Sequence, residues 1–133
     1  MTQSFAFASF YKKLGNLYFA IAASDNKISN KEKTAIEELV YYHWKHQENS
    51  TDRFGTDAAY FILFQFETLA DGVVHPESAY QSFANFFMEN KDQVDHWLRK
   101  KIFESAKHVA EAVRGVSEKE MHYLIKLKDL LQL

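Results

Sequence analysis

The sequence predicts an all-α protein, a compact bundle of about six helices built from helix-turn-helix pairs. Apolar residues recur at steps of three and four along most of the 133 residues, which is the period of an amphipathic helix. Two Ser-x-x-Glu sequences, beginning at Ser29 and Ser117, are capping boxes, in which the serine and the glutamate bond to each other's backbone amides at the start of a helix. Only one proline and four glycines occur, so polar clusters must form most of the turns. We expect residues 1–133 to form one domain.

The first half of the chain predicts three helices. The first runs from about Phe5 to Ala23, and Gly15 inside it indicates the close approach of a neighbouring helix. The capping box at Ser29 begins a second helix, which continues to about His46 and is followed by a polar loop.

The third helix, from about Asp57 to Ala70, is apolar on nearly every side. Such a helix in a soluble protein is usually buried on all sides, so we expect residues 58–69 to form the central helix, with Phe64 in the core. The pair Asp71-Gly72 ends the helix, and we expect Gly72 to take the left-handed conformation of a C-cap.

The second half predicts three more helices. Pro76 suits the first position of the fourth helix, where a missing amide costs nothing. Asn90 and Gln93 resemble a cap and its partner before a long fifth helix, whose apolar stripe includes Trp97. The second capping box then opens the last helix.

Composition excludes several classes of function. Sixteen basic and eighteen acidic residues, well mixed along the chain, give a net charge of −2, which does not favour nucleic acid as a partner. The basic triplet Arg99, Lys100 and Lys101 is most simply a solvated helix face. Because cysteine is absent, there is no disulfide framework and no cysteine-based zinc site. The apolar run 58–64 is too short to span a bilayer, and no signal peptide is recognisable, so we expect a cytoplasmic protein without a membrane span.

No pattern typical of an enzyme is present, because the sequence has no glycine-rich phosphate loop and no recognisable nucleophile–base pair or metal triad. His43 and His46 are spaced to share a metal ion on one helix, and Glu104 and His108 also share a helix face. Solvated or core-edge histidines are the simpler interpretation of both pairs.

The acidic residues of the turns are the principal candidate site. Asp25, Glu32, Asp71 and Glu77 lie in or beside two inter-helix turns, where their oxygens are suited to a hard divalent cation such as Ca²⁺ or Mn²⁺. The alternative is structural, since carboxylates at helix N-termini bond to free amides and stabilise the helix dipole.

Aromatic residues suggest a different function, a small-molecule site in an aromatic-lined cavity between the third and fourth helices. The rings that could line it recur at helical spacing, and aromatic residues at that spacing more often form a simple core. They are Phe61, Phe64, Phe66, Phe83, Phe86 and Phe87.

The turn sequences AIAASDNKISNKEK and TLADGVVHPES, with the ending EAVRGVSEKEMHYLIKLKDLL, resemble the TerB tellurite-resistance family over about residues 17–131. The N-terminal domain of DjlA-type membrane co-chaperones is similar. The resemblance implies an all-helical fold, a bacterial stress-response or membrane-surface context, and divalent-cation binding at the acidic turns. Asn26 replaces the usual glycine of the first turn, and Arg114 stands where the third turn would carry an aspartate.

The function expected from this resemblance is that of a non-enzymatic TerB-like interaction module, with a divalent cation at the acidic turns. Its partner is an unknown protein, and both a membrane-associated partner and a homo-oligomer are compatible with it. A small-molecule-binding helical protein with an aromatic-lined cavity is the alternative.

Overall fold

The computed structural model describes residues 7–24, 28–44, 59–112 and 116–133, and these residues form helices and connecting turns without a β-strand. The elements in chain order are α1 (Phe7–Ala22), α2 (Asn30–Leu39), the π-helix η1 (Val40–Trp44), α3 (Tyr60–Ala70), α4 (Pro76–Asn90), the 3₁₀ helix η2 (Lys91–Gln93), α5 (His96–Ala110) and α6 (Glu118–Leu131). The all-α class and the six α-helices are therefore confirmed. No helix in these ranges is long and apolar enough to cross a membrane.

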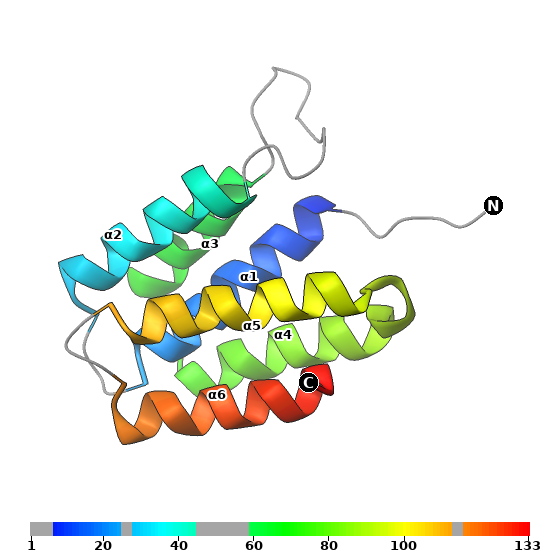
Figure 1. The fold of residues 1–133 in the computed structure, drawn as a ribbon. Helices are drawn as coiled ribbons and strands as arrows, with labels where there is room; N and C mark the ends of the chain where they lie inside the picture. The colour runs from blue at the N-terminus through cyan, green and yellow to red at the C-terminus, as the bar shows by residue number, and fades with distance from the viewer. Residues whose placement is uncertain (1–6, 25–27, 45–58, 113–115) are drawn as a thin grey trace, which may run out of the picture.

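Successive α-helices run in opposite directions (Figure 1). The C-terminal ends of α1, α3 and α5 therefore lie at the same end of the bundle as the N-terminal ends of α2, α4 and α6 (Figure 1). Glu32 in the first turn of α2, Asp71 just after α3 and Glu77 in the first turn of α4 lie at this end.

The central helix is α1, not α3. Helix α1 packs against α3, α4, α5 and α6, and from Phe10 to Ala22 only Lys12 and Lys13 escape full burial. In α3, only Ile62 and Phe66 are fully buried, and Phe64 is 56% exposed. The expectation of a central third helix with a buried Phe64 is therefore wrong. An apolar sequence shows that a helix has apolar faces, but it does not show that the fold supplies a neighbour for each of them.

Gly15 confirms the expected close approach, because it lies directly against the backbone of α3 at Ile62. The next residue, Asn16, accepts a hydrogen bond of 2.9 Å from the Gln65 amide, so polar side chains bond at the same crossing. The absence of a side chain at Gly15 thus allows α1 and α3 to pack closely.

Helix α2 does not continue regularly to His46. It ends at Leu39 and changes to the π-helix η1, which places Trp44 in the core while Tyr41 and Tyr42 remain exposed. The Trp44 indole donates a hydrogen bond of 2.9 Å to the hydroxyl of Tyr18, which donates one of 2.7 Å to Ser105. This buried chain joins η1, α1 and α5. His46 lies outside the described residues.

Both predicted capping boxes are present. Ser29 accepts a bond from the Glu32 amide and Ser117 accepts one from the Glu120 amide, and each glutamate bonds back to the serine amide. Pro76 is the first residue of α4, as expected.

The predicted cap of the fifth helix is wrong. Asn90 ends α4 and Gln93 lies in η2, whereas Asp95 caps α5 by accepting a 2.8 Å bond from the Leu98 amide. The left-handed conformation expected for Gly72 is also wrong, because α3 ends at a right-handed Asp71 and Gly72 does not have a left-handed φ.

The basic triplet of α5 is only partly a solvated face, because Lys100 is exposed but its two neighbours are not. Arg99 donates bonds of 2.8 Å to the carbonyls of Val94 and Lys91, so it fastens η2 to the start of α5. The ammonium of Lys101 lies 5.0 Å from the Trp44 ring centroid and 5.2 Å from that of Trp97. Trp97, which we expected in the apolar stripe, is 63% exposed.

Candidate functional site

Glu32, one of the four predicted cation ligands, is used by the N-terminal cap of α2. It is 3% exposed, and its carboxylate accepts bonds of 2.9 Å from the Ser29 amide and 3.2 Å from the Ser29 hydroxyl. A cation would compete with both bonds.

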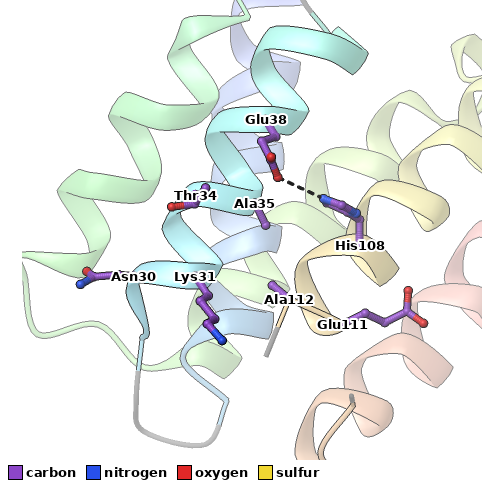
Figure 2. Close-up of a pocket in the computed structure, with 8 residues that line it drawn as sticks. All are labelled: Asn30, Lys31, Thr34, Ala35, Glu38, His108, Glu111 and Ala112. Atoms are coloured by element: carbon purple, nitrogen blue, oxygen red, sulfur yellow. Dashed lines mark ion pairs between the residues drawn. The ribbon is translucent and has the colours of Figure 1, made fainter. Parts of the chain in front are cut away.

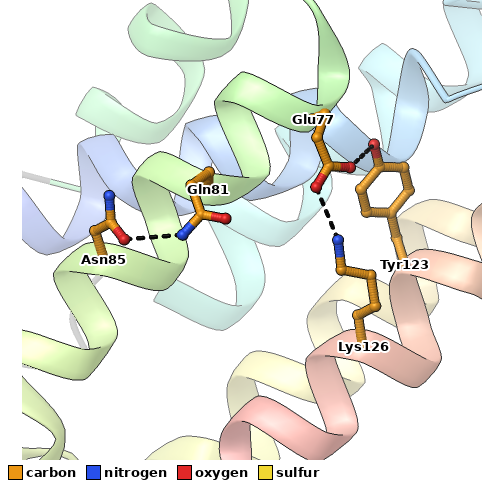
Figure 3. A network of polar contacts seen from close by, with 5 residues as sticks. All are labelled: Glu77, Gln81, Asn85, Tyr123 and Lys126. Carbon is orange, nitrogen blue, oxygen red and sulfur yellow. Dashed lines mark hydrogen bonds and ion pairs between the residues drawn. The ribbon is translucent and has the colours of Figure 1, made fainter.

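Glu77 joins α4 to α6 (Figure 3). Its carboxylate accepts a bond of 3.1 Å from the Tyr123 hydroxyl and forms a 2.9 Å ion pair with Lys126. The hydrogen bond from Lys126 is the main reason that the pKa of Glu77 is below its usual range. Burial, together with the Glu77 charge, raises the pKa of Tyr80 and of Tyr123 to about 12. This carboxylate, too, is engaged by protein groups.

Asp71 is exposed at the end of α3 and, together with Asn30 at the start of α2, borders a groove of about 420 Å³ between these helices. The N-terminal end of α2 and the C-terminal end of α3 therefore border the same groove. Asp25 lies outside the described residues. Within the described ranges, no three histidine or acidic side chains are grouped closely enough to hold a metal ion. The four-residue cation site remains a prediction.

The histidines interact between helices rather than along one helix. The rings of His43 and His108 are 6.4 Å apart, and the His108 Nε2 lies 3.9 Å from the Glu38 carboxylate. Burial, followed by the nearby charges of Lys101 and His108, lowers the pKa of His43. Spacing along the sequence could not reveal this contact, because His43 and His108 belong to different helices.

A second groove, of about 450 Å³, lies between α2 and the C-terminal end of α5 (Figure 2). Its surface is mostly apolar, and Ala35 and Ala112 contribute small side chains to it. The contact between Glu38 and His108 crosses from one helix to the other (Figure 2). Sequence reasoning missed this groove because its two walls meet only in the folded chain.

Lys31 and Glu111 also line the α2–α5 groove, and both are exposed. Neither side chain pairs with an oppositely charged group in the described part of the chain. Among the described residues, the groove therefore combines an apolar surface with the Glu38–His108 contact and with a lysine and a glutamate that have no ion-pair partner there.

Neither of the two grooves lies between α3 and α4, where we expected the aromatic-lined cavity. Helix α1 packs on both α3 and α4 and lies between them (Figure 1). Phe66, Phe83 and Phe87 are buried in the common core, and of the six predicted rings only Phe66 lines either groove. Phe61 and Phe86 pack against this core, whereas Phe64 is exposed.

In comparisons with protein-family models, curated proteins and solved structures, no match to this chain was found.

Proposed function

We propose that this chain is a non-enzymatic interaction module of the TerB-like type, and that it binds a protein partner in the α2–α5 groove. The observation that carries the proposal is the groove itself, with a mostly apolar surface between Ala35 and Ala112 and with Lys31 and Glu111, which have no ion-pair partner among the described residues. The buried centre of a protein–protein interface is typically apolar, and its rim is polar and solvent-accessible.

The expected mode of binding follows from the small side chains. Alanine on both walls leaves room for an apolar side chain of the partner, and burial of that side chain supplies affinity. Charges at the border of an interface contribute mainly to specificity and to the rate of association. A partner segment with an apolar anchor and flanking charges of both signs fits this arrangement.

Affinity purification from cell extract tests the proposal. A partner recovered with the wild-type chain should be lost with Glu111→Lys, which places two cations at the groove. Lys33→Glu is the control charge reversal, since Lys33 belongs to α2, the opposite wall of the groove, but its side chain lines the α2–α3 groove instead. Recovery of the same partner with Glu111→Lys, or its loss with Lys33→Glu alone, would place the interaction elsewhere.

The proposed module also includes a divalent cation at the acidic turns, supported by the shared border of Asn30 and Asp71. Two aspartates brought together repel one another, so a bound cation should raise the melting temperature. We expect Ca²⁺ or Mn²⁺ to produce this shift and the double change Asp25→Asn with Asp71→Asn to abolish it. Asp92→Asn, in η2, should leave the shift intact. No shift with either ion would remove the cation from the proposal.

A further inference from the structure

The outward face of α3 is an apolar surface on a helix that we expected to be buried. Ile62 and Phe66 point into the core, and at 3.6 residues per turn the opposite face carries a different set of residues. They are Tyr60, Phe61, Phe64, Glu67, Thr68 and Asp71. Phe64, near the middle of this face, is 56% exposed.

Further aromatic residues lie on this face and on the neighbouring π-helix η1. The ring centroids of Phe61 and Phe64 are 6.4 Å apart. The π-helix η1 packs beside α3 and presents Tyr41, 56% exposed, and Tyr42, 75% exposed. Exposed apolar patches mark interaction sites in soluble proteins, and Phe64 is the exposed large apolar residue of the α3 face. Exposed aromatic rings are also the residues that contribute most to protein interfaces.

Charges of opposite sign lie at the two ends of the α3 face. At the N-terminal end, the ammonium of Lys12 lies 5.5 Å from the Phe61 ring centroid. At the C-terminal end, Asp71 is exposed, and its carboxylate has no ion-pair partner among the residues placed by the structure. Glu67, exposed on the same face, lies between Phe64 and Asp71. The face is thus positive at its N-terminal end, apolar near Phe64 and negative in its C-terminal half.

This order of charges is complementary to its own reversed copy. We propose that the α3 face binds a second copy of this chain, with the two α3 helices antiparallel across a two-fold axis near Phe64. Lys12 of each copy then lies beside Asp71 of the other, and the helix dipoles are also antiparallel. A parallel arrangement would bring like charges together, which disfavours it.

Sedimentation velocity of the full chain over a wide concentration range tests the proposal. We expect a monomer–dimer equilibrium in the wild type and a monomer for Phe64→Glu at every concentration. Ile125→Glu, on α6, is the matched control because Ile125 is also 56% exposed, and it should dimerise like the wild type. Circular dichroism checks that both variants are folded. A monomeric wild type, or a dimer unaffected by Phe64→Glu, would overturn the proposal.

Charge reversal tests the antiparallel arrangement independently of Phe64. Lys12→Glu and Asp71→Lys should each weaken the dimer. The double variant should restore it, because residues 12 and 71 again carry opposite charges, with the signs exchanged. Failure of the double variant to recover would contradict the antiparallel contact.

Cross-linking through an introduced cysteine tests the position of Phe64 directly. The chain has no cysteine, so Phe64→Cys introduces a single thiol. A short bis-maleimide should link two copies of this variant, whereas Ile125→Cys should remain unlinked; the reverse result would exclude Phe64 from the interface.

Discussion

Gly15 of α1 lies so close to α3 that a Cβ atom added to it would be 2.7 Å from the carbonyl oxygen of Ile62 and 2.8 Å from the Cβ of Gln65. The nearest of these atoms belongs to the backbone, which cannot move aside as a flexible side chain can. The contact explains why glycine occurs inside the most buried helix of the fold.

Gly15→Ala should therefore destabilise the protein, although alanine has the higher helix propensity by ~1 kcal/mol. Overpacking at such a contact typically costs about 1–3 kcal/mol, so we expect a net decrease in the free energy of unfolding in urea. Gly72→Ala is the control, since its added Cβ would have no neighbour closer than 3.6 Å. Equal stability of the two variants would contradict the close packing of α1 on α3.

Tyr18→Phe tests the buried hydrogen bonds between η1, α1 and α5. Without the hydroxyl, the Trp44 indole N–H loses its acceptor, and an unsatisfied buried donor costs about 1–3 kcal/mol. Trp44→Phe removes the donor, so the double variant should lose less stability than the sum of the two single variants. Additive losses in urea unfolding would show that the two side chains do not interact.

Arg99→Lys should destabilise the junction between η2 and α5 although it conserves the charge. The guanidinium donates to two carbonyls in a fixed planar geometry that the single ammonium of lysine does not reproduce. We expect a loss on the order of 1 kcal/mol, the typical net value of a protein hydrogen bond. Lys100→Arg, on the exposed side of the same helix, is the control for an exchange between lysine and arginine. An unchanged free energy of unfolding for Arg99→Lys would contradict the role given to Arg99.

Acid should weaken the packing of η1 on α5 through His43. The pKa of His43 is below the ordinary histidine value of 6.5 because burial, Lys101 and His108 disfavour its charged form. The unfolded chain therefore binds more protons than the folded chain once the pH falls below about 6.5, and stability decreases with falling pH. The decrease ends below the folded-state pKa, where both states are protonated.

His43→Gln should reduce this loss of stability, measured as the fall in melting temperature between neutral pH and about pH 5, where an ordinary histidine is charged. His96→Gln, at the start of α5, is the control for removal of a histidine from this part of the fold. An identical pH profile for the wild type and His43→Gln would show that His43 is not the responsible group.

Features determined by near neighbours in the chain were predictable from the sequence. The helical class, the capping boxes at Ser29 and Ser117, and Pro76 at the start of α4 depend on backbone hydrogen bonds and torsion angles within a few residues. The cap of α5 was mispredicted even so, because Asn90 and Asp95 are both chemically suitable, and the insertion of η2 decides between them.

Only the tertiary structure decided which apolar faces are covered and which polar groups meet. Helical periodicity indicates that α3 is apolar, but Phe64 is exposed because α1, rather than α3, takes the central position. Glu77 and Asp71 are both acidic turn residues, yet only Glu77 has Tyr123 and Lys126 of α6 beside it. His43 similarly contacts His108 across two helices. Such contacts depend on how helices distant in sequence pack together, and the local preferences of a single chain segment do not specify that arrangement.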